Sequence, residues 1–364
     1  MLEKLTVGLD ARSYPIWIGE AILDRAGEAL EEVNFPRTVA VISNPTVHAV
    51  YGERLLDVLH RDGFKASSIL IPDGEEYKNL DTLKTIYDAL IEKGFDRSSG
   101  LIALGGGVVG DITGFAAATY LRGIPFAQVP TTLLAQVDSS VGGKTGVNHP
   151  LGKNLIGAFY QPLHVHIDVN TLATLPPREF AAGMAEVVKY GIIRDRAFFE
   201  WLSISKNRLE GMECAALVEA VKRSCQIKAN VVEIDEKESS LRAILNYGHT
   251  FGHAVETLSG YGEVRHGEAV AIGMVVAARI SRELGLCSRD DVAAIRDLLA
   301  AFNLPVNPPV FSLDAFLAAM GRDKKVKAGV LRLVLNRGIG DCLIREIADP
   351  ETLFAAVLFS LSQE

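Results

Sequence analysis

Short runs of β-branched and aliphatic residues alternate with helical patterns in the first half of the chain. The runs TVAVIS (38–43), SSILIP (67–72) and GLIALGGG (100–107) each indicate a buried strand that ends in turn residues. Apolar residues at helical spacing lie between them, at 47–61 and 80–93. This alternation predicts βαβ units and therefore a mainly parallel sheet.

The pattern changes near residue 176, within TLPPREF (174–180). From Glu179 onward the apolar spacing is mostly helical. One exception, GVLRLVLNRGIGDCLIREI (329–347), indicates a hairpin around residues 337–340. We therefore expect an α/β domain over residues 1–175 and a mainly α-helical domain over 176–364.

Composition and charge narrow the class of protein. Of 364 residues, 48% are hydrophobic and 23% charged, which is ordinary for a globular protein. A net charge of −8 argues against nucleic-acid binding, and the longest apolar run, 269–278, is too short to span a membrane. The first residues lack the features of a signal peptide, and four widely spaced cysteines indicate free thiols in a reducing compartment. We expect a cytoplasmic protein that binds neither membranes nor nucleic acids.

A glycine-rich turn joins the third of these strands to the helix that follows. Gly105, Gly107 and Gly110 satisfy G-x-G-x-x-G, in which the backbone can approach a pyrophosphate at a helix N-terminus. The usual acid about twenty positions on is missing, because Asp111 is adjacent and Asp138 is too distant. The turn also follows the third strand of the chain rather than the first. We therefore expect the ribose of a dinucleotide to be held after other strands, by Asn44 of the first turn and by Glu75 and Lys78 of PDGEEYK (72–78).

The segment PTTLLAQVDSSVGGKTGVNHPLGKN (130–154) is polar and rich in glycine, as in loops that wrap a ligand. Between residues 112 and 153, Asp138 is the only acid, which favours a small anionic ligand or, alternatively, a solvated face. The groups available to a ligand are hydroxyls, one carboxylate, two amines and one amide, from Thr131, Thr132, Asp138, Lys144, Lys153 and Asn154.

Two histidines four residues apart occur in GHTFGHAVE (248–256). On a helix, His249 and His253 point to the same side, which is how one helix supplies two metal ligands. No glutamate lies between them to act as a base, so peptide hydrolysis is not indicated. The pair by itself also fits packed or capping histidines.

Several motifs together closely resemble the 3-dehydroquinate synthase family of sugar-phosphate cyclases. They are the 130–154 segment with GGGVVGDITGF, LRGI, GAFYQP, AEVVKYG, LNYGHTFGHAVE, HGEAVAIGM and RDKK, and they extend over nearly the whole chain. The resemblance implies an α/β NAD-binding domain followed by a helical domain that binds metal and substrate. It places the active site in the cleft between the two, with NAD and one divalent metal, zinc or alternatively cobalt, as cofactors.

The resemblance also assigns roles to individual residues. The metal ligands match Glu186, His249 and His266, which leaves coordination positions open as in catalytic zinc sites, and His253 matches a residue that handles protons or substrate oxygens beside the metal. The positions that match contacts to the substrate carboxylate and hydroxyls are Lys144, Lys189, Lys228, Arg242 and Asn246. Those that match phosphate contacts are Lys153, Asn154 and either Lys324 or Lys325, with Arg122 reaching the phosphate from the neighbouring subunit of a homodimer.

NAD contacts are implied at Asn44, Asp73, Glu75, Lys78, Gly105, Gly106, Gly107, Asp111, Thr131, Thr132, Asp138, Lys144, Lys153 and Thr174. Some members of the family carry an acid at the position of Asn44, facing the ribose.

The implied activity is the cyclisation of 3-deoxy-D-arabino-heptulosonate 7-phosphate to 3-dehydroquinate and phosphate, in the shikimate pathway of aromatic amino acid biosynthesis. Transient oxidation by NAD acidifies a neighbouring hydrogen, phosphate leaves by β-elimination, and reduction, ring opening and an internal aldol addition follow. NAD ends as it began. The many cations around one substrate predict that the RDKK loop closes over it when it binds.

Three alternatives differ from this activity. Related cyclases act on sedoheptulose 7-phosphate or glucose 6-phosphate, but Lys228, Asn246 and the pair Lys324–Lys325 favour a substrate with a carboxylate. A metal-dependent polyol dehydrogenase of similar architecture would release NADH and would not need the lysines of 144–153. A catalytically inactive binding or scaffold protein is disfavoured because every ligand position is intact.

Overall fold

The computed structural model describes residues 2–260, 263–307, 313–321, 326–327 and 330–349. The chain packs into two compact units, Met1–Leu175 with Met212–Lys237 and Pro176–Gly211 with Glu238–Glu364. The first division falls next to the boundary that we expected near residue 176. The segment 212–237, which the sequence pattern groups with the helical half, packs instead with the first unit.

The first unit is built on a mostly parallel sheet with the order β1-β2-β9-β6-β5-β3-β4. Its strands are β1 (Leu2–Val7), β2 (Tyr14–Gly19), β3 (Thr38–Ser43), β4 (Lys65–Leu70), β5 (Ser99–Gly105), β6 (Phe126–Pro130) and β9 (His164–Asp168). Only β1 and β2 pair antiparallel in this sheet, with Leu2 opposite Gly19. The expectation of a mainly parallel sheet is confirmed.

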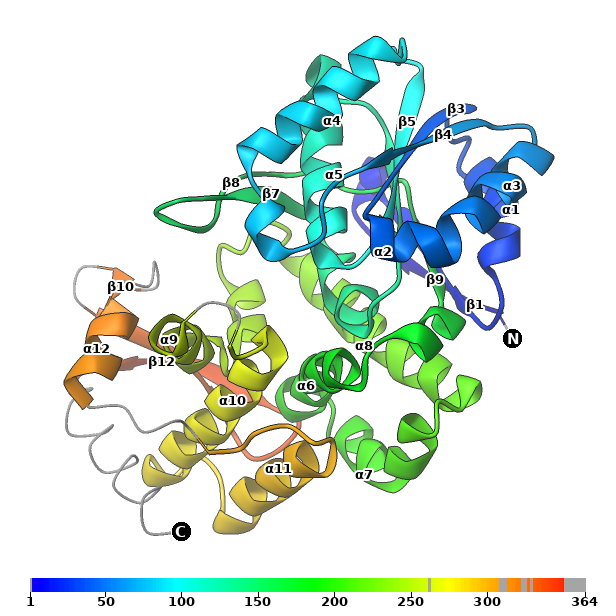
Figure 1. Ribbon diagram of the computed structural model, residues 1–364. Coiled ribbons are helices and arrows are strands. Elements are labelled where there is room, and N and C mark those ends of the chain that lie inside the picture. Colours follow the sequence, from blue (N-terminus) through cyan, green and yellow to red (C-terminus); the bar gives the residue numbers. More distant parts are fainter. Residues whose placement is uncertain (1, 261–262, 308–312, 322–325, 328–329, 350–364) are drawn as a thin grey trace. The chain divides into compact units, whose positions relative to one another are not determined.

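Helices cover both faces of the sheet at β3, which explains why its residues 39–42 are all hydrophobic. Val39 and Val41 of β3 pack with α1 (Ala26–Glu32) and α3 (Glu53–Arg61). Ala40 and Ile42 point the other way, toward α4 (Leu80–Glu92) and α5 (Gly107–Thr119). Figure 1 shows these two pairs of helices on opposite sides of the strands. Because neither face of β3 meets water, its hydrophobic residues follow one another without polar residues between them.

The prediction that the glycine-rich turn follows the third strand of the chain is wrong, because β1 and β2 precede β3. The β1 sequence, LEKLTV, carries charged residues and is only partly buried, as suits a strand at the edge of the sheet. Its polar positions resemble a solvated segment rather than the buried runs that identified β3, β4 and β5.

Helix α8 (Cys214–Ile234) belongs to the first unit because it packs on β1 and β2. A separate hairpin, β7 (Lys144–His149) and β8 (Gly152–Phe159), also belongs to this unit. The segment 130–154, expected as a loop, therefore contains all of β7 and the start of β8.

The second unit is mainly helical, as expected. Its helices are α6 (Pro177–Arg194), α7 (Arg196–Glu210), α9 (His249–Ser259), α10 (His266–Glu283), α11 (Arg289–Ala301) and α12 (Leu313–Gly321). The predicted hairpin is confirmed and consists of β11 (Val330–Asn336) and β12 (Cys342–Ile347). A third strand, β10 (Val326–Lys327), pairs with the other side of β11. In the part of the chain that the structure describes, no helix is both long and apolar enough to cross a membrane.

Candidate active site

Three residues far apart in the sequence converge within the second unit. Glu186 lies in the middle of α6, whereas His249 and His266 are the first residues of α9 and α10. Glu186 Oε1 is 3.6 Å from His249 Nε2 and 4.0 Å from His266 Nε2. One ligand atom from each residue lies within 4.8 Å of the others, which fits the binding of a single metal ion.

The carboxylate of Glu186 supports this interpretation. Its side chain is completely buried, and Oε2 accepts a hydrogen bond from Lys189 Nζ one helical turn further on. Among the described residues, none donates a hydrogen bond to Oε1. A buried carboxylate oxygen without a donor is costly, and a metal ion beside it would remove that cost. The residues therefore fit a divalent cation.

Close helix packing brings the two histidines together. A Cβ atom on Gly273 of α10 would collide with the carbonyl oxygen of Gly248, the residue that precedes α9. A Cβ on Gly252 would lie 3.0 Å from Ala269 O. Gly248 itself has φ of 79°, a conformation that glycine adopts without strain. These glycines let α9 pack closely on α10 (Figure 1). The packing allows both histidines to face Glu186.

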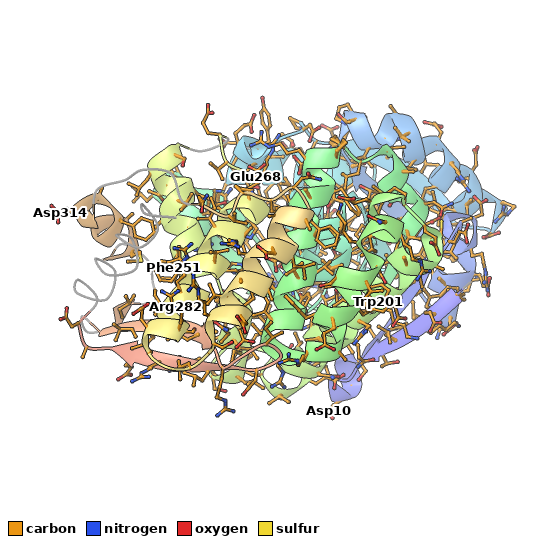
Figure 2. The ribbon with its side chains drawn as sticks, turned by 90° about the horizontal axis from the view of Figure 1, so that it is seen from below. Asp10, Trp201, Phe251, Glu268, Arg282 and Asp314 are labelled. Carbon is orange, nitrogen blue, oxygen red and sulfur yellow. The ribbon has the colours of Figure 1, made fainter. Side chains whose placement is uncertain are left out.

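The start of α10 is also tied to the start of α6. Glu268, labelled in Figure 2, accepts hydrogen bonds from Arg178 Nε at 2.6 Å and from Arg265 N at 2.9 Å. The second bond caps the N-terminus of α10. Because His266 is the first residue of that helix, this network fixes where its ring lies.

The i,i+4 histidines of the sequence occur on a helix, as predicted. The rings of His249 and His253 are 5.7 Å apart, and those of His253 and His266 are 6.2 Å apart. His253 therefore lies next to the cluster without being one of the three residues around Glu186 Oε1. Glu256, which the sequence analysis did not single out, lies 3.3 Å from His266 Nδ1; its position one turn after His253 was the available signal.

Other predicted residues of the second unit lie on the short helix η8 (Leu241–Asn246) that leads to α9. Arg242 is 2% exposed, and Asn246 donates a hydrogen bond of 2.6 Å to Glu238. Glu238 is a second residue that the sequence analysis missed. The predicted phosphate contacts Lys324 and Lys325 lie outside the described residues.

In the first unit, the predicted NAD contacts follow the carboxyl ends of neighbouring parallel strands. Asn44 follows β3, Asp73 lies after β4, and Thr131 and Thr132 follow β6. The chain runs from β3 outward to β4 and returns to β5 on the other side, so the strand order reverses between β3 and β5. Ligands of parallel α/β sheets bind at such a reversal. The contribution of several strand ends to a dinucleotide site stays a prediction.

The glycine-rich turn lies at that point, between β5 and α5, with Gly107 as the first residue of the helix. A Cβ atom on Gly106 would lie 3.1 Å from Thr132 Cγ2, and one on Gly107 would lie 3.0 Å from Ser139 Oγ. Because the turn residues are glycines, they have no side chains that could cover the backbone amide groups at the start of α5. Such amide groups suit the binding of a phosphate. Nearby, Asn44 donates a hydrogen bond of 2.8 Å to Asp73.

Lys78 connects several of these loops. Its amine donates to Asp111 Oδ2 at 2.5 Å and to Asn154 Oδ1 at 2.7 Å, and its side chain is 5% exposed. Burial by itself lowers the pKa of Lys78, but the negative charges of Asp111 and Glu75 outweigh it and the pKa is raised. Glu75 accepts a hydrogen bond of 2.7 Å from Asn148, which the sequence analysis missed. Lys78 is therefore a charged link from the segment after β4 to helix α5 and strand β8.

A second link joins Asp138 to helix α8. Lys228 Nζ donates at 2.6 Å both to the carboxylate and to the backbone carbonyl of Asp138. Although Lys228 was expected in the helical domain, it packs with the α/β unit because α8 does. The structure thus brings together two residues that were assigned to different domains.

The remaining predicted residues of this unit do not share one cluster. Lys144 begins β7 and Lys153 lies in β8, both with exposed side chains. Thr174 Oγ1 hydrogen-bonds to Tyr51 OH at 2.7 Å. Arg122 is exposed at the end of a short helical turn and has φ of 71°.

Two family models match the chain, 3-dehydroquinate synthase N-terminal over residues 68–182 and C-terminal over residues 183–326. A relative from Syntrophotalea carbinolica, named 3-dehydroquinate synthase, is 66% identical over 357 residues, which covers 98% of this chain and 99% of the relative. Another from Pelobacter propionicus with the same name is 56% identical, covering 97% and 98%.

Solved structures share the fold over the same length. The 2-epi-5-epi-valiolone synthase of Streptomyces hygroscopicus subsp. jinggangensis 5008, with NAD+ and Zn2+ bound, gives a TM-score of 0.89 at 29% identity and covers 98% of each chain. A 2-deoxy-scyllo-inosose synthase complexed with carbaglucose-6-phosphate, NAD+ and Co2+ gives 0.88 at 28%, covering 98% of this chain and 99% of the other. With matches in sequence and in fold over almost its entire length, this chain belongs to the 3-dehydroquinate synthase family.

Proposed function

We propose that this chain is a 3-dehydroquinate synthase, a phosphate-eliminating lyase that converts 3-deoxy-D-arabino-heptulosonate 7-phosphate into 3-dehydroquinate and phosphate. The observation that carries the proposal is the convergence of Glu186, His249 and His266 on one buried oxygen to which no residue in the described part of the chain donates a hydrogen bond. It occurs in a chain 66% identical to a relative of that name.

The proposed metal centre consists of Glu186, His249 and His266, with zinc or alternatively cobalt as the ion. Zn2+ and Co2+ occur in the two structural neighbours described above, and two imidazoles with a carboxylate are common ligands for both ions. When bound, the ion would supply a Lewis acid that acidifies a substrate hydroxyl.

The proposed NAD site follows the carboxyl ends of the parallel strands. Its residues are Asn44, Asp73, Glu75, Lys78, Gly105, Gly106, Gly107, Asp111, Thr131, Thr132, Asp138, Lys144, Lys153 and Thr174. Bound NAD would supply a hydride acceptor that becomes a donor later in the same turnover. The assignment of NAD binding to residues 1–175, and of metal and substrate binding to residues 176–364, belongs to this proposal, with Lys228 of α8 as a contribution from the first unit.

The chain's own cations would balance the charge of the substrate. Lys189 and Arg242 are almost completely buried, so a carboxylate beside them would gain more from their charge than it would at the surface. We assign the substrate carboxylate and hydroxyls to Lys144, Lys189, Lys228, Arg242 and Asn246. We assign the phosphate to Lys153, Asn154 and one of Lys324 and Lys325. His253, next to the metal ligands, would take or return a proton at a substrate oxygen.

Phosphate release by the metal-loaded chain with NAD in catalytic amount tests the proposal. We expect many turnovers of 3-deoxy-D-arabino-heptulosonate 7-phosphate per NAD. Glu186→Gln should lose both bound metal and at least a hundredfold in turnover, whereas the exposed Glu200→Gln on α7 should retain both. One NADH released for each substrate consumed would instead identify a dehydrogenase.

A second candidate follows from the structural neighbours, whose names include valiolone and inosose synthases. If the chain had such an activity, sedoheptulose 7-phosphate or glucose 6-phosphate would be cyclised faster than the keto acid. Measuring kcat/KM for all three substrates on one preparation decides between them.

The proposal includes a cytoplasmic homodimer in which Arg122 reaches the phosphate bound by the partner subunit. Its exposed side chain supports this role. Mixing Arg122→Ala with Lys144→Ala after partial denaturation should restore activity to hybrid dimers, because one of their two sites then has both residues. Equal inactivity of the mixture and of each variant alone would contradict the shared site.

A further inference from the structure

Glu256 is a buried carboxylate beside the three clustered residues and is used by none of the roles above. It lies on α9, two turns after His249 and one turn after His253, and it is 8% exposed. Its Oε1 atom is 3.3 Å from His266 Nδ1. A buried carboxylate persists in a protein when a donor or a positive charge lies next to it.

The two nitrogens of His266 face different carboxylates. Nε2 is 4.0 Å from Glu186 Oε1, whereas Nδ1 is 3.3 Å from Glu256 Oε1. A neutral imidazole carries one proton, and a nitrogen that binds a metal must be without it. If Nδ1–H donates to Glu256, the lone pair of Nε2 is directed toward Glu186.

His249 has the same arrangement with a different acceptor. Its Nδ1 lies 3.1 Å from the backbone oxygen of Tyr247, and its Nε2 faces Glu186 Oε1. A carbonyl oxygen can only accept, so Nδ1 of His249 must carry the proton. Both imidazoles thus offer Nε2 to the same point.

We propose that Glu256 is a positioning residue that selects the Nδ1–H tautomer of His266 and orients its ring for metal binding. The inference rests on the proposed metal centre and adds to it a residue that does not touch the ion. Hydrogen-bond acceptors behind histidine ligands act in this way in many metal sites, and their loss weakens metal binding roughly 10–100-fold.

A competing arrangement uses the same atoms. His253, Glu256 and His266 also offer ligand atoms within 4.8 Å of one another and could hold a second ion. That ion would need His266 Nδ1 without its proton, while the first ion needs Nε2 without its proton. A single imidazole would have to lose both protons, so the two arrangements exclude each other unless it becomes an anion.

The experiment is a Co2+ titration of the metal-free full-length chain against a competing chelator, followed by visible absorption. We expect one Co2+ per chain in the wild type and about 10–100-fold weaker binding for Glu256→Ala. Glu256→Gln should lose less, because its amide oxygen can still accept from Nδ1–H but lacks the charge. The matched control is Thr257→Ala, which removes an exposed side chain on the same helix and should leave affinity unchanged.

A second readout separates positioning from general support of the fold. Nitrogen-15 shifts of labelled histidines in the metal-free chain report which ring nitrogen carries the proton. We expect the proton of His266 on Nδ1 in the wild type and on Nε2 in a substantial fraction of Glu256→Ala molecules. A structural role alone would lower the unfolding temperature of the metal-free chain and leave this tautomer unchanged.

The results that overturn the inference differ from those that overturn the metal centre. Wild-type affinity in Glu256→Ala, or a second Co2+ that this variant loses, would show that Glu256 does not act through His266. Failure of the wild type to bind Co2+, or full affinity in Glu186→Gln, would instead remove the proposed metal centre.

Discussion

At the scale of single residues, the candidate site depends on charges that are buried together. Glu186 pairs with Lys189 on one helix, and Lys78, in the segment between β4 and α4, pairs with Asp111 of α5. Such pairs contribute little net stability, but removal of one partner leaves the other charge without compensation. Each pair therefore keeps a charged group available to a ligand at a buried position where a charge without a partner would be destabilising.

Loss of the Lys78 amine should destabilise the chain through Asp111. We expect Lys78→Met to lower the free energy of unfolding by about 2 kcal/mol, less than the roughly 3–5 kcal/mol of a fully buried pair because Asp111 is 21% exposed. The double variant Lys78→Met/Asp111→Leu should recover most of this loss. Urea unfolding measures both, and an additive double variant would show that the pair is not coupled.

At the scale of elements, the position of the metal ligands depends on how closely helices pack. Glycines on α9 and α10 remove the side chains that would hold the helices apart. His249 and His266 are the first residues of their helices, so a small shift of either helix moves a ligand directly. The packing of α9 on α10 is therefore part of the site.

Gly273→Ala should disturb both stability and metal binding, because its Cβ would collide with the backbone oxygen of Gly248. We expect a loss of about 1–3 kcal/mol, typical of overpacking, and at least tenfold weaker binding of Co2+. Gly211→Ala is the matched control, since its Cβ would meet no atom closer than 3.1 Å. Thermal unfolding and the chelator titration provide the measurements; unchanged metal affinity in Gly273→Ala would contradict the link between packing and site.

Sequence patterns predicted strands β3, β4 and β5 and the hairpin of β11 and β12, but not the other strands of the large sheet, β1, β2, β6 and β9. The runs of β3 and β5 were recognisable because helices cover both faces of these strands, whereas β4, at the edge of the sheet, is only partly buried. β1 was missed because an edge strand keeps polar positions, and α8 was grouped with the wrong unit because an amphipathic helix does not reveal which surface covers it. Metal ligands were identified through their motifs, whereas Glu256 and Asn148 lie within the quoted segments 248–256 and 130–154 but were distinguished from their neighbours only by their contacts.

At the scale of the molecule, two buried histidines in the sheet make the stability of the folded chain depend on pH. His164 and His166 of β9 are 1% exposed. His166 Nε2 lies 2.7 Å from Ile22 O and must donate, so its Nδ1 accepts from His164 Nε2 at 3.3 Å. Burial lowers the pKa of His166 to about 4 and holds the pKa of His164 well below its usual value.

The free energy of unfolding should therefore fall as the pH drops below about 6.5. Below that pH the two histidines bind protons in the unfolded chain but not in the folded chain. Above that pH the contribution is complete, and between about 6.5 and 4 His166 should cost about 1.4 kcal/mol per pH unit, to which His164 adds in the same direction. His166→Gln should flatten this slope, and the exposed His60→Gln should not. Urea unfolding at several pH values measures the slopes, and equal slopes in His166→Gln and the wild type would contradict this origin.

The sequence by itself determined the alternation of strands and helices, the parallel sheet, the helical second half and the family, because these depend on local periodicity and on contiguous motifs. Only the tertiary structure decided that Glu186, His249 and His266 meet at one buried oxygen, that α8 joins the first unit, and that Glu256 lies behind His266. Contacts between residues tens of positions apart depend on how helices pack against one another. Close packing at single glycines produces no periodic pattern in the sequence from which those contacts could be predicted.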